Sequence, residues 1–250
     1  MISDRRQRIL RALIEEYVVH AMPVGSRTLT ENYDLGVSSA TVRNELSALE
    51  EAGYITQPHT SAGRVPTDAG YREFVDELLA EDTKTVNAIH DEMAARLRHH
   101  ADALDNLIRN VSEELTRLTN CLSIVGYMDE SSESESSSYE FAHKERLGVA
   151  SLMRKPEFQE SATLLPLMEI LEDDSVYIKA LTEASSTTDG FSVRIGAENE
   201  DSNLTGVSVV SGLYSAGPAT GVVAIIGPRR MDYGNVISAV KAARDILNMQ

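Results

Sequence analysis

The stretch "SSATVRNELSALEEAGYITQPHTSAGRVPT", residues 38–67, decides the fold expected for the first third of the chain. Its first half spaces three apolar residues at the interval of one buried helix face: Val42, Leu46, Leu49. Ser38 or Ser39 precedes this face as a candidate N-cap, and Gly53 follows it as a candidate stop. The pattern therefore predicts a capped amphipathic helix that ends near residue 52.

The second half of the stretch predicts a small β-hairpin. Two short β-prone runs, 54–57 and 64–66, flank a polar loop at 58–63 that contains proline and glycine. Such a segment is too short and too polar to form a hydrophobic core of its own. The preceding helices indicate what it does instead.

Two further helices are expected upstream. Residues 4–20 carry a helical stripe of apolar side chains, and Ser26 is a candidate cap for a short helix at 27–33 that buries Leu29. Three helices followed by a hairpin are the outline of a winged helix-turn-helix, here over residues 1–80. A further helix is expected to start at 66–68.

The third predicted helix has the side chains of a DNA-reading element. Its first turn offers hydroxyl groups near the positive end of the helix dipole, and the arginine and asparagine that follow can bind guanine and adenine in the major groove. The hairpin loop adds small or cationic groups that suit a DNA backbone. The predicted DNA contacts are Ser38, Ser39, Thr41, Arg43, Asn44, His59, Thr60, Ser61 and Arg64. The competing interpretation is an ordinary capped surface helix.

Charge restricts where DNA can bind. The 250-residue chain has a net charge of −16, which opposes nonspecific attraction to nucleic acid. Residues 1–75 hold 8 Lys/Arg and 10 Asp/Glu, a balance of −2, so the remaining residues carry −14. A contact with a polyanion is therefore expected in the first third and must be local.

The rest of the chain predicts a regulatory part. Residues 86–118 form a long amphipathic pattern, which fits either a helix packed on its own domain or a dimerisation helix. We expect domains at 81–128, comprising this helix and the start of the regulatory domain, and at 141–250, joined by an acidic Ser-rich linker at 129–140.

Within 141–250 we expect helix over most of 141–183, with breaks at Gly148 and Pro156. Three β-rich runs follow at 191–196, 206–214 and 219–227, and a final amphipathic helix covers them. Strands with a covering helix predict a small α/β domain, and the whole chain is expected to be α+β.

No catalytic, cofactor-binding or metal-binding pattern is present. The chain lacks the nucleophile-elbow, Walker A and zinc-protease motifs, and the pair His99-His100 is best explained by a solvated helix face. Cys121, the single cysteine, is expected to be a buried structural thiol in a reducing cytoplasm. The chain also lacks a run of eighteen apolar residues, and its amino terminus has no apolar segment of signal-peptide type. We therefore expect a cytoplasmic, non-enzymatic protein that does not enter a membrane.

Several segments resemble the heat-inducible transcription repressor HrcA family. The resemblance covers residues 4–79 most specifically, since "QPHTSAGRVPT" is not a general wing sequence. It is carried by "PVGSRTL", "LGVSSATVRNEL", "LEEAGYITQPHTSAGRVPTDAGYREFVD", "GVASLMRKPEF", "IGAEN" and "IIGPRRMDYGNVISAV". It implies a homodimeric repressor that binds an inverted-repeat operator upstream of chaperone genes. It also implies a GAF-like second domain and control by a GroEL-type chaperonin.

The chain departs from that family in its middle. Only a short segment lies between the long helix and "GVASLMRKPEF", where the family has several strands and a dimerisation region. We therefore hypothesise that the helix 86–118 takes a larger share of dimerisation. The alternative function is a ligand-sensing winged-helix regulator unconnected with heat shock.

Overall fold

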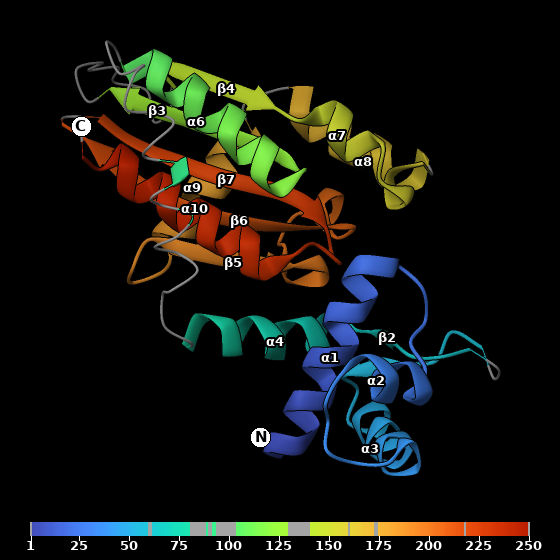
Figure 1. Cartoon of the computed structure of the whole chain (residues 1–250). Coiled ribbons are helices and arrows are strands. Elements are labelled where there is room, and N and C mark those ends of the chain that lie inside the picture. Colours follow the sequence, from blue (N-terminus) through green and yellow to red (C-terminus); the bar gives the residue numbers. More distant parts are fainter. Residues whose placement is uncertain are drawn as a thin grey trace. The chain divides into compact units, whose positions relative to one another are not determined.

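The computed structural model describes residues 2–59, 62–80, 89, 92–93, 104–129, 141–159, 161–172, 175–217 and 219–249. These residues belong to two compact units (Figure 1). The first comprises Met1–Asp82 with Arg229–Asp232, and the second comprises Thr83–Pro228 with Tyr233–Gln250. No helix among the described residues is both long enough and apolar enough to span a bilayer.

The first unit is helical with one small hairpin. Its elements are α1 (Asp4–His20), α2 (Ser26–Asn32), α3 (Ser39–Glu51), β1 (Ile55–Thr56), β2 (Val65–Pro66) and α4 (Asp68–Ala80). Apolar residues of the first three helices meet in a core, where Leu13, Leu29 and Val42 are fully buried. The helices predicted at 4–20 and 27–33, and the one that follows Ser38, are thus confirmed. The cap predicted at Ser26 is wrong, because α2 begins at Ser26 and its N-cap is Gly25.

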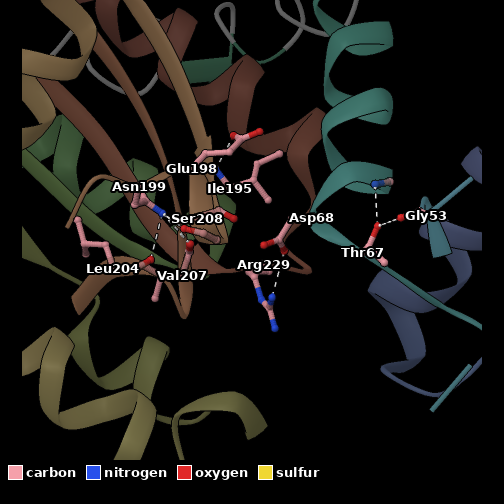
Figure 2. A network of polar contacts seen from close by, with 12 residues as sticks. Gly53, Thr67, Asp68, Ile195, Glu198, Asn199, Leu204, Val207, Ser208 and Arg229 are labelled. Atoms are coloured by element: carbon pink, nitrogen blue, oxygen red, sulfur yellow. Dashed lines mark hydrogen bonds and ion pairs between the residues drawn. The ribbon is translucent and has the colours of Figure 1, made fainter. Parts of the chain in front are cut away.

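The hairpin is closed by side chains as well as by strand pairing. Strands β1 and β2 are antiparallel, with Ile55 opposite Pro66. Gln57 donates a hydrogen bond from Nε2 to the Ala62 carbonyl at 2.7 Å, across the loop. Thr67 then ends the hairpin, because its Oγ1 donates to the Gly53 carbonyl at 2.6 Å and accepts from the Gly70 amide at 3.2 Å (Figure 2). The second bond caps the first turn of α4.

The second unit is built on one sheet. Its helices are α6 (Leu104–Thr119), α7 (Val149–Met153), η1 (Pro156–Phe158), α8 (Ser161–Glu172), α9 (Ser175–Ser185), η2 (Gly196–Glu198), η3 (Ser202–Leu204) and α10 (Tyr233–Leu247). Its strands are β3 (Leu122–Asp129), β4 (His143–Leu147), β5 (Phe191–Ile195), β6 (Val207–Ala216) and β7 (Ala219–Pro228). The strand order is β4-β3-β7-β6-β5, and every neighbouring pair is antiparallel. The α+β class is therefore correct.

Helices cover both faces of this sheet. Helices α6 and α10 lie on the face turned to the viewer in Figure 1, and α9 lies behind the sheet. Successive side chains of a strand point to opposite faces, so a strand covered on both sides is apolar at almost every position. Strand β7 shows this, because Val222 and Ala224 join the core on the α8 and α9 side while Val223 and Ile225 are buried as well.

A buried asparagine holds the connection between β5 and β6. Asn199 is 4% exposed, and its Nδ2 donates to the carbonyl oxygens of Gly196 at 2.9 Å, Leu204 at 3.0 Å and Val207 at 3.1 Å (Figure 2). The Gly196 carbonyl also accepts a hydrogen bond from the Asn199 amide at 3.2 Å. Asn199 therefore joins η2, η3 and the start of β6 by side-chain hydrogen bonds, and it is the last residue of the "IGAEN" segment.

The expectation of helix across most of 141–183 is wrong at its start. Residues His143–Leu147 form the edge strand β4, paired with β3 from Ser123–Leu147 to Tyr127–His143. The sequence of β4, "HKERL", has no apolar alternation because an edge strand presents charged side chains to solvent. Strand β3 itself, within the segment assigned to the long helix and the start of the regulatory domain, was not foreseen as a strand.

The predicted long helix 86–118 is described at residues 89 and 92–93 and, continuously, from residue 104 onward. Helix α6 buries Leu107, Ile108, Val111 and Leu115 and packs on α10 and β3 of its own unit. For α6, packing within the domain is the observed role. Residues 94–103, including His99-His100, and the acidic segment 130–140 lie outside the described residues. Cys121 is buried, as predicted, and is not part of a disulfide bond.

Candidate nucleic-acid interface

The amino terminus of α3 is organised by hydroxyl groups. Ser38 is the N-cap, and its Oγ accepts a hydrogen bond from the Thr41 amide at 3.3 Å and lies 3.0 Å from Thr41 Oγ1. Ser39 Oγ donates to Ser26 Oγ at 3.1 Å, which joins the first turn of α3 to the start of α2. Three of the predicted contact residues therefore also set the position and direction of the helix.

Helix α3 separates its apolar and polar faces as the sequence predicts. Val42 and Leu49 are 0% exposed and Leu46 is 2% exposed, whereas Arg43 and Asn44 are exposed. The helix packs on α1 and α2 through its apolar face. Arg43 and Asn44 are thus presented on the outside of a helix fixed by the core beneath it.

The hairpin is attached to the helices through Arg64. The amide of Val24 donates to the Arg64 carbonyl and the amide of Arg64 donates to the Val24 carbonyl, both at 2.8 Å. The Arg64 guanidinium donates to Glu50 Oε2 of α3 from Nη2 at 2.9 Å and from Nε at 3.1 Å. Arg64 is therefore placed at the base of the hairpin, with its side chain only 20% exposed. Its predicted contact with DNA stays a prediction.

The remaining hairpin residues of the predicted site are only partly described. His59 is exposed at the loop, and its carbonyl accepts a hydrogen bond from the Ala62 amide at 2.8 Å. Thr60 and Ser61 lie outside the described residues. Five of the predicted contact residues therefore lie together at the amino-terminal end of α3: Ser38, Ser39, Thr41, Arg43 and Asn44. Arg64 of the hairpin is paired with Glu50 of the same helix.

A cleft lies between the hairpin and the helices, and the sequence did not predict it. It has a volume of about 210 Å³ and is lined by residues 24–26, Arg43, Leu46 and 62–64. Gly63 is required here, because a β-carbon on it would lie 2.5 Å from the backbone carbonyl carbon and oxygen of Val24. The only sequence signals for the cleft were glycines at 25 and 63.

Most cations of residues 1–82 are neutralised by carboxylates. The basic side chains of residues 1–82, histidines apart, are eight arginines. Six of them pair with Asp or Glu, and the pairs are Arg5–Glu45, Arg6–Glu45, Arg11–Glu15, Arg27–Glu31, Arg64–Glu50 and Arg72–Asp76. The hydrogen bond from Arg6 also lowers the pKa of Glu45. Arg8 and Arg43 form no ion pair with any residue that the structure describes.

Known proteins of similar sequence show the class to which this protein belongs. The HrcA protein C terminal domain family matches residues 82–237. The heat-inducible transcription repressor HrcA of Frankia casuarinae is 33% identical, over 97% of this chain and 96% of the relative. The protein of the same name from Brevibacillus brevis is 30% identical, over 96% and 95%. By name, both relatives are repressors of transcription.

The chain belongs to the heat-inducible transcription repressor HrcA family. The crystal structure of a hypothetical protein superposes with a TM-score of 0.78 at 21% identity, over 100% of this chain and 98% of the other, which shows a shared fold. The alignment with the Frankia protein runs over 330 positions, whereas this chain has 250 residues. The difference means that at least 80 aligned positions of that relative have no counterpart here.

Proposed function

We propose that the first unit is a winged helix-turn-helix that binds operator DNA. Helix α3 enters the major groove, and the β1–β2 hairpin is the wing beside it. The single observation that carries this proposal is the outward face of α3, where Arg43 and Asn44 stand on a capped helix whose opposite face is fully buried. The contact set is the predicted one: Ser38, Ser39, Thr41, Arg43, Asn44, His59, Thr60, Ser61 and Arg64.

We propose further that the repressor acts as a homodimer on an inverted repeat that controls chaperone genes. A two-fold symmetric dimer matches a palindromic site, because each subunit reads one half-site. The second unit then acts as a GAF-like regulatory domain that responds to a GroEL-type chaperonin in the cytoplasm. Membership of the heat-inducible repressor family supports this assignment.

Selection from a random duplex library tests the proposal. The purified full-length chain is used to enrich 30-base-pair duplexes at several salt concentrations, and the enriched duplex is then titrated by gel shift with and without a GroEL-type chaperonin. We expect an enriched inverted repeat, two subunits per duplex and tighter binding with the chaperonin. Failure to enrich any sequence would refute operator binding, and enrichment of an unrepeated half-site would refute the dimer.

A further inference from the structure

The cleft between the hairpin and the helices is preformed in the first unit. Val24 and Arg64 are joined by two backbone hydrogen bonds, and Arg64 is joined to Glu50 of α3. Ser39 Oγ on α3 donates to Ser26 Oγ on α2. Three segments that are distant in the sequence are therefore held in register around one small space, so a ligand finds the cleft without first having to assemble it.

The chemistry of the cleft suits one anion. Arg64 is neutralised by Glu50, whereas Arg43 has no carboxylate partner among the described residues, so the cleft keeps one positive charge. The Ser26 hydroxyl already accepts from Ser39, which leaves its own hydrogen available for an outside acceptor. A guanidinium and a hydroxyl donor at one place are the groups that proteins direct at phosphate oxygens.

The size of the cleft indicates which part of DNA it takes. A volume of about 210 Å³ equals about seven water molecules at their liquid volume, enough for a phosphodiester group with part of its sugars. A base edge in duplex DNA stays in the stack and is reached by side chains that project into a groove. A recessed cleft therefore fits the protruding backbone better than it fits a base.

We propose that this cleft seats one backbone phosphate of the bound DNA, with Arg43 and Ser26 as its ligands. This proposal rests on the proposed function and divides the exposed face of α3 into two tasks. Arg43 positions the protein on the backbone and carries no sequence information, while Asn44, its exposed neighbour on α3, is left to read a base. Gly63 preserves the shape of the cleft, because a side chain there would collide with the Val24 backbone and force the hairpin away from it.

The test compares Arg43→Ala with Asn44→Ala in the full-length protein. Dissociation constants are measured by fluorescence anisotropy on the selected duplex and on a scrambled duplex of equal length. The measurements are repeated at salt concentrations from about 50 to about 200 mM. For Arg43→Ala we expect an equal loss on both duplexes, about tenfold, and a salt slope that falls by about 0.9. For Asn44→Ala we expect a loss on the selected duplex alone, with the slope unchanged.

Two further arms make the outcome decisive. Arg43→Lys keeps the charge and should restore the salt slope, which separates charge loss from misfolding. Single phosphates of the duplex are replaced by neutral methylphosphonates. At one position per half-site the replacement should weaken DNA binding by the wild type but not by Arg43→Ala. At the same position, Ser26→Ala should lose less affinity than the wild type does. A preferential loss by Arg43→Ala on the selected duplex, or no position coupled to Arg43, would overturn the proposal. A wild type that prefers no duplex would refute the proposed function itself.

Discussion

Replacing Gly63 by alanine should detach the hairpin from the helices. The new methyl group would stand 2.5 Å from the Val24 carbonyl carbon and oxygen and 2.6 Å from its nitrogen. All three atoms are backbone, so no side-chain rotation can relieve the collision. The segment 62–64 has to move away from Val24, and the two 2.8 Å hydrogen bonds between Val24 and Arg64 are then lost.

The size of the effect follows from these two losses. Each backbone hydrogen bond contributes about 1 kcal/mol net, and forced overpacking costs about 1–3 kcal/mol. We therefore expect the free energy of local opening to fall by about 3–5 kcal/mol. Because about 1.4 kcal/mol corresponds to tenfold, exchange of the Val24 and Arg64 amide hydrogens should speed up about 100-fold or more.

Amide hydrogen exchange followed by NMR measures this directly, and Gly25→Ala is the matched control. Gly25 lines the same cleft, but a β-carbon on it comes no closer than 4.0 Å to Thr28 Oγ1, and its φ of −94° is one that alanine adopts. Gly25→Ala should leave the exchange of both amides within about threefold of the wild type, since the substitution creates no collision. Equal protection in Gly63→Ala and Gly25→Ala would refute the reasoning.

Three further predictions concern the second unit. Asn199→Ala should lower the free energy of unfolding by about 2–4 kcal/mol in urea titrations, because it removes three buried side-chain hydrogen bonds to backbone carbonyls, whereas Ser202→Ala at an exposed site should change it by less than about 0.5 kcal/mol. Burial raises the pKa of Glu183, opposed by the positive charge of Arg194. The charged carboxylate therefore destabilises the folded state at pH 7, so Glu183→Gln should stabilise it there; the gain should fade as pH falls through the raised pKa of the folded state and be absent below the ordinary value of 4.5, and a gain that grew on acidification would contradict this. Cys121, 1% exposed, should resist a thiol reagent in the native protein and react fully in denaturant; rapid native reaction would contradict its burial.

The parts of the fold that the sequence predicts well are those whose side chains repeat at a fixed interval. Helix α3 follows from a serine cap and from Val42, Leu46 and Leu49, and its exposed face follows from the same spacing. Strand β7 follows from a continuous apolar run that fits burial on both faces. Strand β4 could not be predicted in this way, because "HKERL" is held by backbone pairing to β3 and its side chains carry no period.

In the candidate site, too, only the features that follow from a repeating side-chain pattern could be predicted. Its α3 residues were found because their positions follow from the helix. The cleft was missed because Val24 and Arg64, forty residues apart, are joined by backbone atoms that leave no mark on the side-chain pattern. The role of Arg64 was also incomplete in the sequence interpretation, since its pairing with Glu50 depends on how the hairpin meets α3.

The paired arginines of residues 1–82 have a consequence for the proposed binding to an operator. Each unpaired cation near the backbone adds to binding at every DNA site, and a genome offers about 10⁶–10⁹ competing sites to one operator. With six of the eight arginines of residues 1–82 paired to carboxylates and a net charge of −16, this chain gains little binding free energy from DNA of random sequence. If the protein binds an operator as proposed, few molecules are held elsewhere on the chromosome, and a small number of copies suffices to keep that operator occupied.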